Sequence, residues 1–435
     1  MHFTFHMRLA STATWVFLFF AISLQAADGS KVFDVRQFGA KGDGRTLDTA
    51  AIQKALEACG RAGGATVKFS PGIYLSQPIT IRTKTTMLLE AGATLLASPT
   101  QSDFLKGGGD FIPFISGKDL TDVTFTGKGT IDGNGAVWWE EAEKARQKVS
   151  GYTLPRPNLI VLTRCKNVRL ENLTVQNSPK FHFVPTDCEG VVVSNVTILA
   201  PEHAANTGAI DPSACKNVLI TKCRIDVGDD NVAIKAGKKV AGREFASEDI
   251  TVTDCTFLHG HGMSIGSETA GGVRNVTVKN CTFENTENGI RIKSQRGKGG
   301  IVENISYSDL TMKNVDPAIT FTCYYMNNSA KDAVRSSPPK ETSAPSAGEK
   351  IPVYRNIRVT NLKATCQKSA GVILGLPNSC ISNVVFENVI LSANTGLTIH
   401  NAKGIQFKNS SVTVKSGPAF SAENAEIEGL ENPQK

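Results

Sequence analysis

Short stretches of alternating apolar and polar residues recur along most of the chain, separated by Gly, Pro and Asn. Early examples between residues 65 and 98 are ATVKFS, TTMLLE and ATLLAS. A period of two places one face of a strand in a core and the other in solvent. The pattern therefore predicts a protein built from many short strands.

From Thr121 the strands follow a repeat in which an Asn precedes a β-branched residue. Its copies are Asn167-Val168, Asn217-Val218, Asn275-Val276, Asn304-Ile305, Asn356-Ile357 and Asn383-Val384. In several copies another Asn or Asp follows five residues after the first, at Asn172, Asn280, Asp309, Asn361 and Asn388. Asn tolerates left-handed backbone, so each can bend the chain between two short strands.

Units of this length cannot bury their own apolar face, so they must stack on one another as a solenoid. The strands are too short for hairpins, and the repeats follow one another without intervening helices. The pattern therefore favours a parallel β-helix over a propeller or a sandwich, forming one domain over residues 27–435.

Two kinds of segment depart from the repeat. Near the start, Asp48 or Thr46 can cap a short helix with Ala51, Ile52, Ala55 and Leu56 on one face and an end at Gly60. Such a helix can plug the stack and hide its strand edge. Residues 139–157, expected to be partly helical, and the Pro-containing loop 327–350 are insertions that we expect to wall a cleft.

The first 26 residues are typical of a secretory signal peptide. Arg8 precedes the apolar run WVFLFFAISL, and Leu24-Gln25-Ala26 offers a small-residue cleavage site. The alternative is a membrane anchor, although the apolar run is short for a spanning helix. We expect a mature protein that is soluble, monomeric and secreted, either to the periplasm or to the medium.

The chain has 435 residues, of which 40% are hydrophobic, so it can bury a large core. Its net charge of +7 is not gathered in runs and aromatic residues are few, which argues against a nucleic-acid partner. A positive excess suits an acidic polymer as substrate, although an ordinary solvated surface explains it equally well.

Ten cysteines allow disulfides in an exported protein. However, Cys165, Cys188 and Cys215 share one register of the repeat, and a second set (Cys223, Cys255 and Cys281) shares another. Cys packs as a small hydrophobe, so we favour mostly stacked free thiols over disulfides. Without a CxxC motif or suitably spaced His residues, we expect no metal and no cofactor.

Polar clusters interrupt the repeat at the spacing of neighbouring coils: NTGAID, VGDDNVAIK, HGHGMSIGSE, ENGIRIKS and ITFTCYY. They can bring Asp229, Asp230, His261, Arg291 and Lys293 to one surface. Adjacent strand residues point to opposite faces, so the Asp pair can face a cleft together only where the backbone leaves strand geometry. Gly228 makes that departure easy.

The ordered motifs NTG, GDD (Gly228 to Asp230), GHG (around His261) and RIK (Arg291 to Lys293) resemble those of glycoside hydrolase family 28, the polygalacturonase family. FGAKGDG, GTIDGNGAVWW, RPNLI and NSPKFHF extend the resemblance over nearly the whole mature chain. The resemblance implies a right-handed parallel β-helix that hydrolyses galacturonan with inversion.

The resemblance also implies roles for residues. Asp229 would be the general acid and Asp230 would help to hold the attacking water, supported by His261. Repulsion between two neighbouring carboxylates should raise one pKa, which keeps the acid protonated. Arg291 and Lys293 would grip a uronic carboxylate. Further substrate contacts would come from Asn206, Tyr325 rather than Tyr324, and His182, although His182 could instead pack on a coil.

Gly208 departs from the family pattern, because the family has a water-activating Asp at this position. Asp230 could act alone as base, Asp211 or another carboxylate could reach in, or the protein could be a binding-only solenoid. For Asp211, which precedes Pro212, a turn-forming role is the simpler interpretation.

Three other interpretations remain open at this stage. A rhamnogalacturonan hydrolase or another exo-acting pectin hydrolase would carry the same motifs. A β-eliminating lyase would want a Ca²⁺ cluster, for which the compact Asp pair is a poor match. The expected partner in the leading interpretation is pectin, polygalacturonate or a related acidic oligosaccharide.

Overall fold

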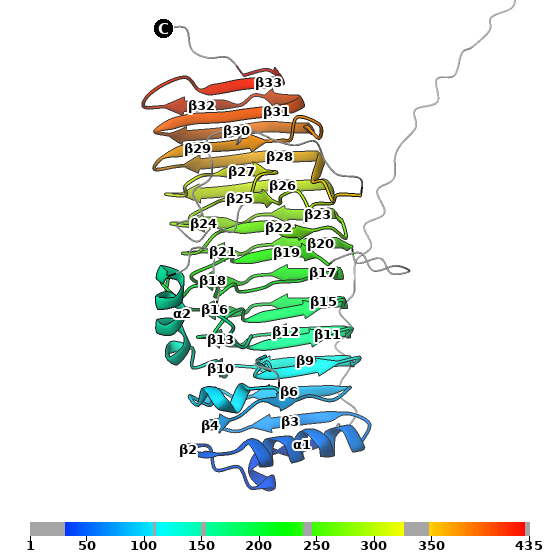
Figure 1. Cartoon of the computed structure of the whole chain (residues 1–435). Helices are drawn as coiled ribbons and strands as arrows, with labels where there is room; N and C mark the ends of the chain where they lie inside the picture. Colours follow the sequence, from blue (N-terminus) through cyan, green and yellow to red (C-terminus); the bar gives the residue numbers. More distant parts are fainter. Residues whose placement is uncertain (1–30, 108–109, 149–153, 238–245, 326–347, 431–435) are drawn as a thin grey trace, which may run out of the picture. The chain divides into compact units, whose positions relative to one another are not determined.

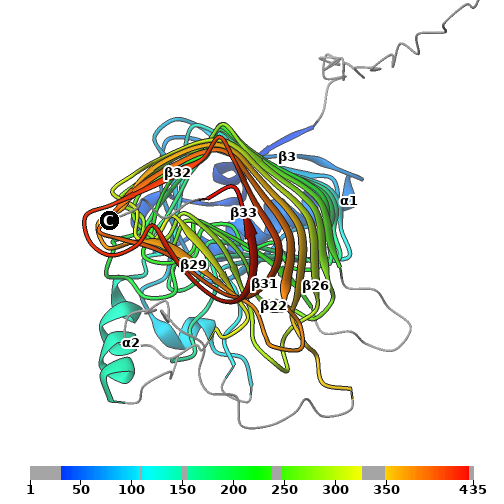
Figure 2. The same ribbon diagram turned by 90° about the horizontal axis from the view of Figure 1, so that it is seen from above.

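The computed structural model of the protein describes residues 31–107, 110–148, 154–237, 246–325 and 348–430. Strands from successive coils lie side by side in parallel (Figure 1), and a view along the stack shows the coils superimposed (Figure 2). This arrangement confirms the predicted right-handed parallel β-helix. The expected signal peptide and most of the expected loop 327–350 lie outside the described residues.

Each coil contributes strands to three parallel ladders. Ladder 1 pairs the strands that begin the coils. Its members are β1 (Val32–Asp34), β3 (Ala65–Phe69), β6 (Thr85–Leu89), β9 (Thr121–Gly127), β12 (Lys166–Glu171), β15 (Glu189–Ser194), β17 (Lys216–Thr221), β20 (Ser247–Thr253), β23 (Val273–Lys279), β26 (Ile301–Lys313), β28 (Val353–Thr365) and β30 (Ile381–Ala393).

Ladder 2 follows ladder 1 in each coil, and the long strands β26, β28 and β30 span both. Its other members are β2 (Asp43–Leu47), β4 (Gly72–Ser76), β7 (Ala93–Ala97), β10 (Thr130–Asp132), β13 (Thr174–Gln176), β16 (Thr197–Leu199), β18 (Arg224–Asp226), β21 (Thr256–Phe257), β24 (Thr282–Glu284) and β32 (Ser411–Val414).

Ladder 3 closes each coil. It contains β5 (Ile79–Thr80), β8 (Ile115–Lys118), β11 (Ile160–Thr163), β14 (Phe183–Thr186), β19 (Val232–Ala236), β22 (Met263–Thr269), β25 (Ile290–Lys293), β27 (Ile319–Thr322), β29 (Ser369–Leu374), β31 (Thr395–Lys408) and β33 (Phe420–Glu428). Between β14 and β19, parallel bridges through Ile210 and Ser213 continue the ladder without a full strand.

The predicted Asn bends are present at the junctions between strands. Asn167, Asn217, Asn275, Asn304 and their counterparts all have φ near +55°. Their amides also form ladders between coils: Asn356 Nδ2 donates to Asn304 Oδ1 at 3.2 Å, and Asn383 Nδ2 donates to Asn356 Oδ1 at 2.8 Å. One residue type therefore supplies both the left-handed bend and the bond to the next coil.

Helix α1 (Thr49–Arg61) lies at the N-terminal end of the stack (Figure 1) and buries its predicted apolar face. Two details differ from prediction. The helix runs through Gly60 to Arg61, and the Asp48 carboxylate accepts from the backbone amides of Lys41 and Gly42 instead of capping its own helix. The role as a cap on the solenoid is as expected.

Helix α2 (Ala136–Lys148) projects beside the coils in Figure 2 and accounts for the helical part of the first insertion. Its Trp138 packs edge-on against Phe104 and Phe111. The short 3-10 helices η1 (Val35–Phe38) and η2 (Gln101–Phe104) complete the non-strand elements of the described residues. None of the helices in these ranges is both long and apolar enough to cross a membrane.

All ten cysteines are free thiols, and eight of them are buried. Cys188 Sγ donates to the Leu162 carbonyl of the preceding coil at 3.4 Å, and Cys215 Sγ donates to Pro185 in the same way at 3.3 Å. This confirms the prediction of stacked thiols packed as small hydrophobes.

Candidate active site

The predicted site residues gather on ladder 3, in successive coils. Ile210 pairs with Val232, Val232 with Met263, and Met263 with Ile290. This register aligns the segments just before these strands, so the GDD and GHG motifs meet in neighbouring coils. On the strands themselves, Ser264 pairs with Arg291.

The Asp pair lies between β18 and β19, outside regular strand geometry, as predicted. The next coil packs closely against the Asp pair, because the backbone amide of His261 donates a hydrogen bond to the Asp229 carbonyl at 2.9 Å. A Cβ added to Gly260, whose φ is +112°, would lie 2.5 Å from that same carbonyl. The first glycine of the GHG motif is therefore required for this close approach.

Asp230 is bound by cations on both of its carboxylate oxygens. Arg291 Nη2 donates to Oδ1 at 2.5 Å, and Lys293 Nζ donates to Oδ2 at 2.8 Å. The Ser264 hydroxyl also donates to Oδ1 at 2.7 Å. All four side chains are buried, so these charge-assisted contacts act in a medium of low polarity.

Asp229 faces the imidazole of the next coil. His261 Nδ1 lies 3.2 Å from Asp229 Oδ1, and its Nε2 lies 3.1 Å from Glu287 Oε2. Asn206 donates from Nδ2 to Asp229 Oδ2 at 3.2 Å, and its own Oδ1 accepts from Arg156 at 2.8 Å. Asn206 thus holds the acid in place in this structure, whereas a substrate contact remains a prediction.

Burial alone would raise the pKa of both aspartates, because it disfavours the charged form. For Asp229, charge from His261 and Lys293 outweighs burial and lowers the pKa. Lys293 and Arg291 likewise lower the pKa of Asp230. The prediction of one raised pKa in this pair is therefore wrong for this arrangement, because cations from two other coils exceed the mutual repulsion.

His261 carries the opposite shift. Burial lowers its pKa, but Asp229 and Glu287 on either side of the ring raise it to about 10. Asp229 and His261 consequently share one proton across the neutral range, and that proton resides on the imidazole in this arrangement. A proton source therefore stands 3.2 Å from the predicted general acid.

Tyr325 is the tyrosine at the site, as predicted over Tyr324. The Lys293 ammonium lies over the Tyr325 ring, 5.0 Å from its centre. Tyr324 instead packs against the hydrophobic core. The Tyr325 ring therefore covers one of the two cations that bind Asp230.

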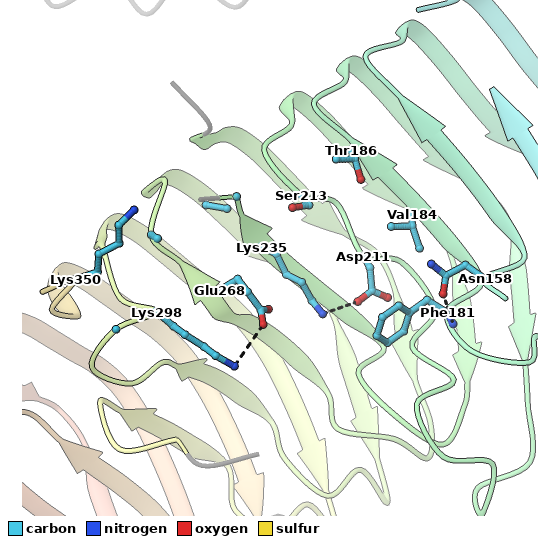
Figure 3. A pocket seen from close by; sticks show the side chains of 14 residues that line it. Asn158, Phe181, Val184, Thr186, Asp211, Ser213, Lys235, Glu268, Lys298 and Lys350 are labelled. Carbon is cyan, nitrogen blue, oxygen red and sulfur yellow. Dashed lines mark hydrogen bonds and ion pairs between the residues drawn. The ribbon is translucent and has the colours of Figure 1, made fainter. Parts of the chain in front are cut away.

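A cavity of about 570 Å³ lies along ladder 3, and its lining includes Asp211 but not Asp229, Asp230 or His261. Figure 3 shows Phe181 and Asp211 together at one end, with the Lys235 ammonium directed towards Asp211. Glu268 and Lys298 form the next ion pair along the cavity, at 3.9 Å. Lys350, the last residue of the second insertion, also lines the space, whereas no described residue of the first insertion does, so the expectation that both insertions wall a cleft remains a prediction.

Asp229, Asp230 and His261 bring potential ligand atoms to within 4.8 Å of one another, close enough to consider a metal ion. However, both oxygens of Asp230 already bind Arg291 and Lys293. This donor set does not fit a divalent cation.

Residues 75–415 match the family described as glycosyl hydrolases family 28. The chain belongs to this family. An endo-polygalacturonase of Pectobacterium carotovorum subsp. carotovorum is 39% identical over 306 residues, which cover 66% of this chain and 74% of that protein.

Solved structures agree with the assignment to family 28. The polygalacturonase from Erwinia carotovora ssp. carotovora is 31% identical, with a TM-score of 0.67 over 88% of this chain and 94% of that one. A hyperthermoactive exopolygalacturonase from Thermotoga maritima is 28% identical, with a TM-score of 0.70 over 94% and 93%. The resemblance inferred from the four motifs is thus confirmed.

Within this family-28 chain, Gly208 is closely surrounded. A Cβ added there would lie 2.7 Å from Asp211 Oδ2 and 3.0 Å from Phe181 Cδ1. Asp211 is 2% exposed, and its Oδ1 forms an ion pair with Lys235 at 3.3 Å. Asp211 lines the cavity, and its carboxylate accepts no hydrogen bond from a backbone amide within the described residues, so it does not cap a turn there.

His182 needs a correction as well. Its side chain is fully buried, with Nδ1 3.1 Å from the Gly208 carbonyl and Nε2 3.2 Å from the Leu199 carbonyl. Burial lowers the pKa of His182 to about 4, so the ring is neutral. Of the two interpretations weighed, packing inside a coil is the one the structure supports, because its neighbour Phe181 is the residue that lines the cavity.

Sequence reasoning missed Lys235, Phe181 and Glu268, which line the cavity. A signal for Lys235 was present: VAIK (Val232 to Lys235) repeats the pattern of IRIK (Ile290 to Lys293). The two segments begin β19 and β25, each paired with β22 between them. Comparing them would have placed Lys235 and Lys293 on the same face.

Proposed function

We propose that this family-28 hydrolase is an exported polygalacturonase that cleaves α-1,4-galacturonosyl linkages of pectin. Support comes from relatives named polygalacturonases. The observation that carries the proposal is the buried pair Arg291 and Lys293, which forms a carboxylate-binding site directly beside two aspartates. A neutral sugar chain would not require it, whereas a uronic acid does.

Substrate binding begins at these two cations. A galacturonate carboxylate entering the site can take over contacts that Arg291 and Lys293 now make to Asp230. The Tyr325 ring, stacked on the Lys293 ammonium, provides an apolar surface for the sugar. Once the cations are shared with the substrate, less positive charge acts on Asp230, and its pKa moves back towards the ordinary range.

Protonation of the leaving group is assigned to Asp229. The Asp229–His261 pair holds one proton, since the pKa of the imidazole is raised to about 10. As the glycosidic bond breaks, the proton passes from His261 through Asp229 to the departing oxygen, which leaves the imidazole neutral and Asp229 ionised. Asn206 fixes the other Asp229 oxygen during this transfer.

The attacking water stands on the opposite face of the sugar from Asp229, as an inverting mechanism requires. Asp230 helps to hold that water, assisted by the contacts that fix its carboxylate. Cleavage by one displacement gives a product of inverted anomeric configuration and no covalent intermediate.

Export rests on the N-terminal sequence, where Arg8, an apolar run and Ala26 form a signal-peptide pattern. Pectin is a cell-wall polymer outside the producing cell, so a secreted location suits this substrate.

The test is incubation of the full-length mature protein with polygalacturonate, followed by reducing-end and ultraviolet measurements. New reducing ends without an unsaturated product are expected. Unsaturated, Ca²⁺-dependent products would instead identify a lyase, and cleavage confined to rhamnogalacturonan would replace the proposed substrate. Absence of cleavage of any uronan would contradict the hydrolase assignment.

A further inference from the structure

Gly208 leaves the site without a side chain where the resemblance implies a water-activating Asp, and Asp211 occupies that place. Its Oδ2 lies only 2.7 Å from the position of a Cβ at residue 208. An aspartate at 208 would carry its own oxygens within the same small volume. The absence of a Cβ at Gly208 therefore makes room for the carboxylate of Asp211.

The register explains why the two positions converge. Ile210 pairs with Val232, so residue 208 occupies the same step of its coil as Asp230 does in the next. Asp211 follows Ile210 and lies opposite Ala233, which is a small, buried residue. A carboxylate from Asp211 thus enters the space next to the Asp230 coil.

The surroundings of Asp211 leave one of its oxygens available. The residue is 2% exposed and lines the cavity; Oδ1 is paired with Lys235 at 3.3 Å, whereas Oδ2 has no hydrogen-bond partner within the described residues. The charged groups that act on it are Lys235, at 3.3 Å, and, further off, Asp229, Asp230 and Lys180. A buried carboxylate with open acceptor sites can take the hydrogen bond of a water in the cavity.

The other carboxylates are poorer bases. Asp230 has both oxygens bound by Arg291 and Lys293, which lower its pKa, and sharing those cations with a substrate carboxylate would return that pKa only towards the ordinary aspartate range, below that of Asp211. Glu268 has a lowered pKa, because Lys235 and Lys298 outweigh its burial, and Glu287 contacts His261.

We propose that Asp211 is the general base of this enzyme, replacing the side chain that position 208 lacks, and that Lys235 is its positioning residue. The inference rests on the proposed hydrolysis of polygalacturonate. The raised pKa of Asp211, which burial brings to about 7 against the opposing charge of Lys235, suits a base that works near neutral pH.

The proton balance is complete with the groups present. The water oxygen bonds to the anomeric carbon while the bond from that carbon to the leaving oxygen breaks. One water proton passes to Asp211, and the single proton of the Asp229–His261 pair passes through Asp229 to the leaving oxygen, which keeps the electron pair of the broken bond. Exchange with solvent then returns both groups to their starting states.

The test compares Asp211→Asn with wild type by steady-state kinetics on polygalacturonate over a range of pH. Loss of a general base predicts a fall in kcat of about 10²–10⁴-fold with little change in KM. In wild type, kcat/KM should fall as the pH drops through about 7, because only ionised Asp211 accepts the proton. Asp211→Asn with wild-type kcat would overturn the proposal.

Two further variants separate a base from a merely structural residue. Gly208→Asp in the Asp211→Asn background should restore activity, because the introduced carboxylate would lie in the same small, buried volume. Lys235→Met should move the acidic limb of the pH–rate profile to higher pH, since Lys235 opposes the raised pKa of Asp211. An inactive double variant together with an unmoved limb in Lys235→Met would contradict the assignment.

Folding is checked by thermal unfolding. Because the pKa of Asp211 is raised from 3.8 to about 7 in the folded protein, its contribution to stability is lost as pH rises through that window. Asp211→Asn should therefore be at least as stable as wild type above pH 7. If Asp229→Asn is inactive while Asp211→Asn is fully active, this inference fails and the proposed function stands; if wild type itself cleaves no uronan, the proposed function fails.

Discussion

Ladders 1 and 3 pass through the same coils, yet their outer faces differ in kind. In β23 of ladder 1, buried and more exposed positions alternate, and Arg274 pairs with Glu248 at the surface. In β25 of ladder 3, every residue is buried, including Arg291 and Lys293.

The difference shows where charge can do chemistry. On ladder 1, water screens each ion pair, so charges there contribute little beyond solubility. On ladder 3, Asp230, Arg291 and Lys293 are buried, so the same residue types shift one another's pKa strongly. One repeat therefore builds a face of screened ion pairs and a face of strongly coupled charges, where we propose that catalysis occurs.

The largest expected effect is on the rate, at Asp229. Asp229→Asn keeps the size of the side chain but removes the proton donor, so kcat on polygalacturonate should fall by about 10²–10⁴-fold. Reducing-end assays measure the rate, and circular dichroism confirms the fold. A variant that folds and retains the wild-type kcat would remove Asp229 from the mechanism.

The next largest effect is expected on stability, and it is seen by comparing an arginine of ladder 3 with an arginine of ladder 1. Arg291→Met leaves buried Asp230 without one of its two cations, which should cost about 3 kcal/mol in the free energy of unfolding. Arg274→Met, its matched control on ladder 1, should cost less than about 1 kcal/mol and leave kcat unchanged. Denaturant titration measures both values, and equal losses would contradict the contrast between the ladders.

A smaller effect is expected at the Asn bends. Asn356→Ala places an alanine at φ +56°, which costs roughly 1–2 kcal/mol, and also removes the amide bonds to Asn304 and Asn383. Asn356→Gly keeps the bend and loses only the amide bonds. Thermal unfolding should rank wild type above Gly and Gly above Ala, with kcat on polygalacturonate unaffected; equal stability of Gly and Ala would show that the bend carries no strain.

The fold was predictable because its determinants are local and repeated. Each Asn-Val or Asn-Ile pair encodes a bend and a strand, and the same code recurs from Asn167 to Asn383. The glycines on either side of His261 interrupt the repeat. This interruption is visible in the sequence, so the coils that carry the predicted site residues could be recognised before the structure was known.

The electrostatics of the site could not be predicted in the same way. The pKa directions of Asp229 and Asp230 depend on cations supplied by coils dozens of residues away. The position of Asp211 depends on a side chain that Gly208 does not have. His182 was misplaced because neighbouring residues alternate between cleft and interior, and one residue of register decides which of them lines the cavity.

The most direct test of the proposed inverting mechanism is the anomeric configuration of the first product released from polygalacturonate, which NMR can follow over time. A water-mediated single displacement by the ladder 3 carboxylates predicts that the new reducing end appears first as the β-anomer and then equilibrates. A product that appears first as the α-anomer would require a covalent intermediate and would contradict the assigned roles of the aspartates.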